Sequence, residues 1–337
     1  MKMNKYIIIA IIAVVTVVLG AAFVLWPRAP KGYSGKTESI TIGSPLNESS
    51  ALIYIAEDQH FFTGDGLNVT VRDYEFGALA LNGMLRGEAD IAVATEFPLV
   101  VKALQKDKVR TIGSIGKFEF VYLIGRKDRG FEKISGLKGK KVATARQTIA
   151  EFYLGRYLNL HGMNFEEITF VDLQNSAQAM DDIVKGHIDA IVSQEPFVTS
   201  IGEHLGANGV VWPVQSGQAM FSPMICRDEW ITHHPELVNR LLNSLAQAEE
   251  YVMNHPIEAE SILQKRLHLN DSYTKTVWLR NQFSLSLDQS LILAMEDEAR
   301  WMIKNNLTTE KNVPNFLDYI YENSLKAVKP EAVNIIR

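Results

Sequence analysis

The sequence is poor in cysteine, and this scarcity excludes several classes of protein. Cys226 is the only cysteine, so neither an intrachain disulfide nor a cysteine-based zinc site can form. The eight histidines show no spacing typical of metal ligands, so we expect no bound metal. The chain also has no block of five or more like charges, and its net charge is −5. Nucleic acid is therefore not an expected partner.

Common motifs of catalytic and cofactor sites are missing as well. The chain contains no G-x-G-x-x-G, P-loop, G-x-S-x-G or H-E-x-x-H. We therefore expect no cofactor. Glu96 and Glu195 could form an acid–base pair of the glycosidase type, but no sugar-stacking tryptophan accompanies them. A binding protein is favoured over an enzyme.

A long uncharged run, from Tyr6 to Trp26, follows Lys2 and Lys5. At about 1.5 Å per residue, a helix of this run would cross a hydrocarbon core of roughly 30 Å. The lysines would stay on the cytoplasmic side, where only five residues precede the run. A cleaved signal peptide is the alternative, because small residues at 20–22 follow an apolar stretch. No cysteine follows the run, which excludes a lipoprotein. Both interpretations export the rest of the chain.

The exported part alternates strands and helices up to about residue 225. Strand patterns occur at residues 39–46, 67–75, 89–94, 110–116, 118–126, 140–145, 168–173 and 188–193, and helical patterns lie between most of them. Such alternation predicts α/β lobes with parallel sheets, after a polar linker at 27–37. From Asp228 onward the pattern is nearly all helical, in segments such as 234–255, 290–306 and 316–328. This tail should pack on the lobes.

One phrase occurs twice, as GEADIAVATEFP at 87–98 and GHIDAIVSQEPF at 186–197. Its glycine, aspartate and glutamate recur 99 residues apart, as Gly87 and Gly186, Asp90 and Asp189, and Glu96 and Glu195. Asp90 and Asp189 are expected to bind backbone amides where their strands start. The strand ends should face a cleft between two similar lobes, because ligands bind at the carboxyl edge of such sheets.

The chain resembles the solute-binding proteins of ABC importers, in the nitrate/sulfonate/taurine-type group with the two-lobed type II fold. The phrases that carry the resemblance are AEDQHFFTGDGLNVTV (56–71), LRGEADIAV (85–93), ISGLKGKKVAT (134–144), VKGHIDAIVSQEPF (184–197) and HPELV (234–238). They occur in the family's order and span about residues 38–325. Where the family favours Trp-Glu-Pro-Tyr, this chain has Gln194-Glu195-Pro196-Phe197, which leaves the ligand's identity open.

The resemblance implies a division into an N-terminal segment (1–37), a first lobe (38–125 and 225–337) and a second lobe (126–224). Two crossings, near 125–130 and 221–227, would form a hinge that lets the lobes close on a solute. It further implies a monomer outside the cytoplasm, anchored by its N-terminal helix or released after signal cleavage, which delivers a small solute to an ABC permease. A related fold serves as a thiamine-pyrimidine synthase, but the cysteine and histidine motifs of that enzyme are absent.

Thirteen polar or aromatic residues near strand ends and helix starts are candidates for the ligand site. They are Asn47, Ser49, Ser50, Glu75, Phe76, Thr95, Glu96, Arg146, Gln147, Thr148, Asn175, Ser193 and Glu195. Arg146 and helix N-termini favour an anionic group, whereas the three carboxylates oppose one. The expected solute is small and organic with polar ends, of the sulfonate or taurine kind.

Two alternatives remain open at this point. Phe76, Phe152 and Phe197 could sandwich an apolar or aromatic body, as in a basic heteroaromatic solute such as a thiamine or riboflavin precursor, or could simply pack in the core. The chain could also be a membrane-anchored sensor module that acts through lateral partners.

The length of the apolar run predicts that the anchor is retained. N-terminal sequencing of the exported protein should therefore begin at Met1 or Met3. A start near Phe23 would instead demonstrate cleavage of a signal peptide and a freely soluble protein.

Overall fold

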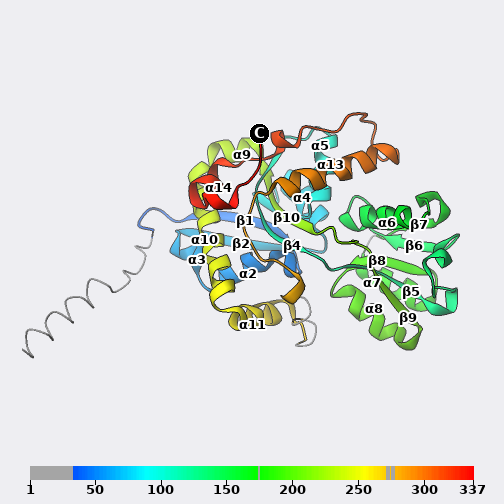
Figure 1. Cartoon of the computed structure of the whole chain (residues 1–337). Helices are drawn as coiled ribbons and strands as arrows, with labels where there is room; N and C mark the ends of the chain where they lie inside the picture. The colour runs from blue at the N-terminus through cyan, green and yellow to red at the C-terminus, as the bar shows by residue number, and fades with distance from the viewer. Residues whose placement is uncertain (1–32, 174, 271–273, 275–277) are drawn as a thin grey trace, which may run out of the picture. The chain divides into compact units, whose positions relative to one another are not determined.

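Two five-stranded sheets organise the part of the chain that the computed structural model describes, residues 33–173, 175–270, 274 and 278–337 (Figure 1). The first sheet has the order β2 (Leu67–Tyr74), β1 (Glu38–Pro45), β3 (Ile91–Val93), β10 (Met220–Arg227) and β4 (Val109–Phe118). The second has the order β7 (Thr169–Asp172), β6 (Lys141–Thr144), β8 (Ala190–Gln194), β5 (Val121–Arg126) and β9 (Gly209–Pro213). We call each sheet with the helices around it the first and the second lobe.

Both sheets are mixed, which corrects the prediction of parallel sheets. The first three strands of each order are parallel, as the βαβ pattern requires. In the first sheet β10 runs antiparallel to β3 and β4, and in the second β5 runs antiparallel to β8 and β9. These antiparallel strands come from the stretches where the chain leaves one sheet and enters the other, so the βαβ rule does not apply to them.

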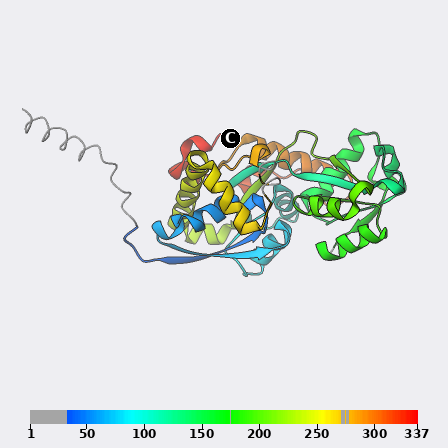
Figure 2. The same ribbon diagram turned by 90° about the horizontal axis from the view of Figure 1, so that it is seen from below.

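Helices cover both sheets, and the C-terminal tail packs on the first lobe as predicted (Figures 1 and 2). Those of the first lobe are η1 (Glu48–Ser50), α2 (Ala51–Asp58), α3 (Phe61–Gly64), α4 (Gly77–Leu85), α5 (Glu96–Leu104), α9 (Asp228–His233), α10 (Pro235–Asn254), α11 (Pro256–Leu267), α13 (Gln289–Lys304), η6 (Phe316–Tyr319), α14 (Asn323–Val328) and η7 (Pro330–Ala332). Those of the second lobe are η2 (Lys127–Arg129), η3 (Ile134–Leu137), α6 (Ile149–Leu160), η4 (Phe165–Glu167), α7 (Ser176–Lys185), α8 (Phe197–Leu205) and η5 (Gly206–Asn208). In the tail, α10 packs on α2, α3 and α14, and α13 packs on α5.

Two predicted helices are each split in the structure. The helix expected from residue 51 breaks between α2 and α3, because His60 has the left-handed φ of 59°. The helix expected over 316–328 breaks between η6 and α14, where Ile320 forms a bridge with Thr111 of β4.

The chain crosses between the sheets earlier than predicted. Since β5 pairs with β8 and β9, the first crossing lies at residues 119–120 and not at 125–130. Since β10 pairs with β3 and β4, the second lies at residues 214–219 and not at 221–227. Strands β4 and β5 were recognised from the sequence, whereas β9 and β10 were not predicted. Pairing between distant segments decides which sheet a strand joins.

The repeated phrase builds the same corner in both lobes. Gly87 and Gly186 have left-handed φ values of 81° and 75°, which favour glycine, and they follow α4 and α7. Asp90 then accepts a hydrogen bond from the N–H of Thr41 in β1 (2.8 Å), and Asp189 accepts one from the N–H of Lys141 in β6 (2.9 Å). The predicted role of the two aspartates is confirmed.

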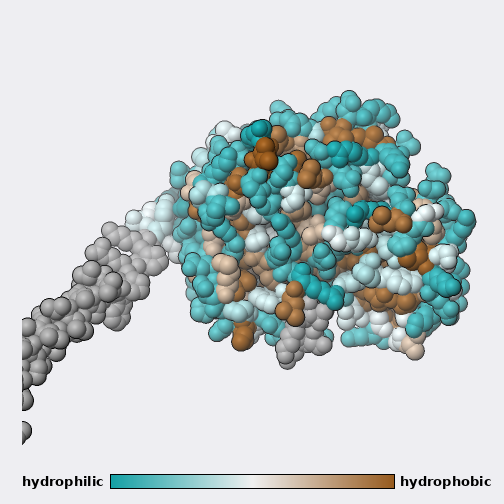
Figure 3. Space-filling model, in the orientation of Figure 1, coloured by the Kyte–Doolittle hydropathy of each residue, from teal (hydrophilic) through white to brown (hydrophobic). Residues whose placement is uncertain are grey.

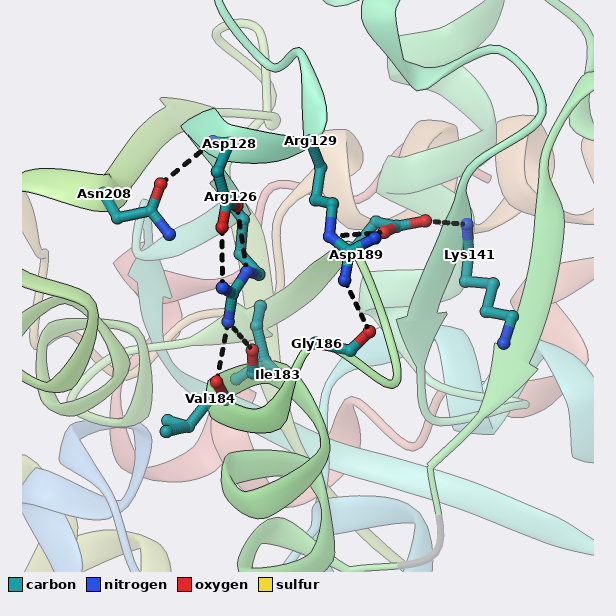
Figure 4. A network of polar contacts seen from close by, with 9 residues as sticks. All are labelled: Arg126, Asp128, Arg129, Lys141, Ile183, Val184, Gly186, Asp189 and Asn208. Atoms are coloured by element: carbon teal, nitrogen blue, oxygen red, sulfur yellow. Dashed lines mark hydrogen bonds and ion pairs between the residues drawn. The ribbon is translucent and has the colours of Figure 1, made fainter.

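In the second lobe, two arginines reinforce this corner (Figure 4). Arg126 donates to the carbonyls of Ile183 and Val184 at the end of α7, and Arg129 donates to that of Gly186. These carbonyls lie at the negative end of the helix dipole, where a guanidinium is favourable. The corner is therefore structural and not part of a ligand site.

Figure 3 shows apolar residues in separate patches among hydrophilic ones. Among these residues, no helix combines the length and the apolar character that crossing a membrane requires. The predicted anchor, Tyr6–Trp26, lies outside them.

Removal of either corner carboxylate should destabilise the fold modestly. We expect Asp90→Ala and Asp189→Ala each to lower the free energy of unfolding by about 1–2 kcal/mol, because each leaves a strand amide without its charged acceptor. Asp181→Ala is the matched control, since it removes only an exposed ion pair with Lys185 and should cost less than about 0.5 kcal/mol. Urea unfolding measures all three. Equal losses in the three variants would contradict a shared corner role.

Candidate ligand-binding site

A cavity lies between the two lobes and is lined from both. Its volume is about 50 Å³, against roughly 10–15 Å³ for one water. The first lobe contributes Pro45, Asn47, Ser49, Phe76, Gly77, Ala78, Thr95 and Pro98, and the second contributes Thr144, Ala145, Thr148, Ile149, Ala150, Leu173, Asn175, Ser176, Ala179, Val192, Ser193, Gln194 and Phe197. All these side chains are uncharged, so recognition here depends on neutral polar groups, backbone amides and apolar contacts.

The first turns of several helices border the cavity. Phe76 precedes α4, Thr95 precedes α5 and Thr148 precedes α6, and none of these three side chains caps its helix. Asn175, in contrast, caps α7 by accepting from the N–H of Gln178 (2.8 Å). Uncapped helix N-termini present amide donors and partial positive charge, which favour an anion.

One buried hydroxyl in the lining lacks a partner. Thr144, at the end of β6, is 1% exposed, and its Oγ1 makes no hydrogen bond within the described residues. A buried hydroxyl without a partner costs free energy, so a group that enters the cavity and bonds Thr144 is favoured.

Seven of the thirteen predicted site residues line this cavity. They are Asn47, Ser49, Phe76, Thr95, Thr148, Asn175 and Ser193. Phe197, predicted as an aromatic wall, lines it too, whereas Phe152 is buried against Phe97 and Trp301. The rule that selected these residues, position at a strand end or helix start, also fits Thr144, Ala145 and Ser176, which the sequence prediction omitted.

The predicted charged residues do not line the cavity, which corrects the electrostatic part of the prediction. Arg146 pairs with Glu151 (3.0 Å) and lies 4.1 Å from the ring centre of Phe170. Gln147 turns outward, and its N–H bonds Glu151 (2.8 Å). Glu195 accepts from the N–H of Thr199 (2.9 Å), in the first turn of α8. Burial raises the pKa of Glu195.

Two further predicted residues are buried away from the cavity. Ser50 bonds the carbonyl of Pro45 (2.9 Å) and the hydroxyl of Ser44 (2.5 Å). Glu96 is fully buried in the first turn of α5, where its Oε2 accepts from the N–H of Phe221 (2.9 Å). A residue that follows a strand end can turn into the core as readily as into the cleft, and the sequence pattern does not separate the two.

Hydrogen bonds join the lobes beside the cavity. Glu75, at the end of β2, accepts from the N–H of Ser176 at the start of α7 (2.6 Å). The Asn47 amide donates to Gln194 (3.4 Å). Glu75 therefore touches the second lobe rather than the cavity, and these contacts hold the two walls together.

The described residues contain no group of three histidine, cysteine, aspartate or glutamate side chains that could hold a metal. Cys226 is fully buried in β10, outside the cavity lining, and burial raises the pKa of its thiol. A thiolate nucleophile is therefore not available in the cavity.

Two mixed sheets of equivalent strand order, joined by two crossings around one cavity, define the two-lobed type II fold of periplasmic binding proteins. A solved structure of the alkanesulfonate-binding protein SsuA from Xanthomonas axonopodis pv. citri, bound to MOPS, has this fold, with a TM-score of 0.73 at 15% identity over 86% of this chain and 100% of that one. The sequence model of the NMT1/THI5-like family matches residues 47–259, more than half of the chain. The chain belongs to this family, which confirms the resemblance seen in the sequence.

Relatives that are similar in sequence are named either as binding proteins or as enzymes. A candidate aliphatic-sulfonates-binding protein of Bacillus subtilis is 21% identical over 88% of this chain and 91% of its own length. A candidate binding protein of Brucella abortus is 24% identical over 67% of this chain and 70% of its own. A 4-amino-5-hydroxymethyl-2-methylpyrimidine phosphate synthase of Aspergillus parasiticus is 22% identical over 62% and 64%. The structure of the desulfurization enzyme DSZB is also similar, with a TM-score of 0.64 at 14% identity over 87% of this chain and 99% of that one.

Proposed function

We propose that the chain is the extracytoplasmic solute-binding component of an ABC importer and that its solute is a small organic sulfonate. The observation that carries the proposal is a cavity between two lobes, lined only by uncharged side chains and bordered by uncapped helix N-termini. A sulfonate head is a pure acceptor with one negative charge spread over three oxygens. It matches amide donors and the Thr144 hydroxyl without requiring a buried cation.

The remainder of the lining suits the organic part of such a solute. Phe76 from the first lobe and Phe197 from the second offer apolar contact on facing walls. The names of the sulfonate-binding relatives support the same class.

The importer role assigns two partners, the solute and a membrane permease. The lobes would close by a hinge at residues 119–120 and 214–219, and the permease would recognise the closed, solute-bound form. Anchoring through residues 6–26 would keep the protein near that permease and outside the cytoplasm, whereas signal cleavage would release it. We propose that it acts as a monomer.

A basic heteroaromatic solute, such as a thiamine or riboflavin precursor, is the second candidate. Phe76 and Phe197 could stack on a ring, and a pyrimidine phosphate synthase is among the relatives. An enzymatic role finds less support, because the single cysteine is buried away from the cavity. A membrane-anchored sensor would use the same cavity and differ only in its partner.

Calorimetry on the purified chain tests the solute class. The panel consists of a short alkanesulfonate, taurine, the matching carboxylate and an aminopyrimidine. We expect the sulfonates to bind, and Thr144→Val to weaken their binding about tenfold, or about 1.4 kcal/mol. Thr169→Val, at an exposed position of the neighbouring strand β7, is the matched control. Arg146→Ala should have little effect, since Arg146 faces Glu151.

Mass spectrometry of any ligand released on denaturation complements the panel. Binding of the aminopyrimidine alone would contradict the sulfonate assignment, and equal affinities in the Thr144 and Thr169 variants would contradict the role of the Thr144 hydroxyl.

A further inference from the structure

Two glutamates are buried together at the boundary between the lobes, outside the cavity. Glu96 on α5 and Glu298 on α13 are both fully buried, and α13 packs on α5. No ion pair within 4 Å reaches either one in the described part of the chain. Glu96 Oε1 and both carboxyl oxygens of Glu298 have no partner there except each other. Two ionised carboxylates buried side by side would be very unfavourable, so at least one proton must be held at this place.

Helix α6 of the second lobe covers these glutamates. Phe97, next to Glu96, stacks on Phe152 of α6 with ring centres 5.9 Å apart. Trp301, one turn after Glu298, lies against Gly155, where an added Cβ would overlap the indole ring. The contact between α5, α13 and α6 is therefore made across the lobes and is lost if they separate.

The other groups around the pair do not neutralise it. From α6, Tyr153 donates to the carbonyl of Gln218 and Arg156 to that of Gln215, so both are engaged with the second crossing. On α13, Asp297 adds a like charge. From β10 only the N–H of Phe221 reaches Glu96. On β4, Lys117 is paired with Asp288.

We propose that Glu96 and Glu298 form a proton-binding pair that couples lobe closure to pH. This inference rests on the proposed function in one respect, the opening and closing of the lobes. In the closed form the pair is dry and protonated. When the lobes open, water reaches it and the proton is released. Solute binding, which favours closure, then takes up protons.

The direction of the pH effect follows from burial. Desolvation raises the pKa of Glu96 from 4.5 to about 8 and raises that of Glu298 well above its usual range. A raised pKa in the closed form favours closure below the ordinary carboxyl pKa, and this advantage disappears as the pH rises through the raised value. The closed population and the solute affinity should therefore fall as the pH rises from about 4.5 to about 8, by at most about tenfold per pH unit for each proton.

The closing motion can be followed without any solute. In the full chain, spin labels on Leu160→Cys and Ile257→Cys report the distance between the lobes, because both positions are exposed and Cys226 is fully buried. We expect the distance distribution to shift from closed to open between pH 6 and pH 9. The shift should become smaller in Glu298→Gln, which keeps the shape and removes one of the two titrating carboxyl groups. Glu296→Gln, on the exposed side of α13 beside Arg300, should behave like the parent chain.

Infrared spectroscopy supplies an independent readout of the proton. At pH 7 a protonated-carboxyl band should be present and should weaken in Glu298→Gln; Glu96→Gln serves if that variant does not fold. Absence of the band, or distances that ignore pH in the parent chain, would overturn the proposal. Neither measurement uses a solute, so failure of sulfonate to bind would refute the solute class alone. Sulfonate binding without any pH-dependent distance would refute the proton coupling alone.

Discussion

The side chain of Gln215 holds together the two crossings on which the relation of the lobes depends. Its amide donates to the carbonyl of Phe118 (3.0 Å), where β4 ends, and its oxygen accepts from the N–H of Val121 (2.8 Å), where β5 begins. The same amide also donates to Gln218 within the second crossing (3.0 Å). One buried carboxamide thus fixes both strands at the place where the chain changes sheets. A cavity between two sheets keeps its walls aligned only if such a joint is well defined, because small rotations there are amplified at the distant rim.

Duplication explains why the cavity has matching walls. The corner formed by Asp90 and Thr41 recurs as Asp189 and Lys141, so β3 and β8 end at equivalent points of their sheets. Thr95 and Ser193 then enter the cavity from opposite lobes. The helices that follow the strands begin at the same edges, and their amide groups supply donors without any charged side chain. An anion can be held by such donors at lower desolvation penalty than a buried cation would carry.

The sequence predicted the architecture well because periodicity and the repeated phrase are local signals. The two α/β lobes, the helical tail and eight of the ten described strands follow from them, whereas β9 and β10 were missed. The charged site residues could not be predicted in the same way. Glu96 and Glu195 occupy equivalent positions in the repeat. Glu96 nevertheless lies in the core beside Glu298, whereas Glu195 accepts from the N–H of Thr199 in the first turn of α8. Arg146 forms an ion pair with Glu151, five residues later. Such partners are chosen by packing in three dimensions, which a strand-end rule does not contain.

The contacts between the lobes act in opposite directions. The bonds between Glu75 and Ser176 and between Asn47 and Gln194, together with Trp301 on Gly155, favour closure. The dry carboxyl pair opposes closure at any pH at which its protons are lost, because closure then buries charge that nothing neutralises. On the proposed function this balance is useful. An empty importer component that closed too firmly would present a false signal to its permease, whereas one that is nearly balanced can be shifted by the differential affinity of a single small solute. The protonation state of the buried pair then determines how much of the free energy of solute binding is needed to close the lobes.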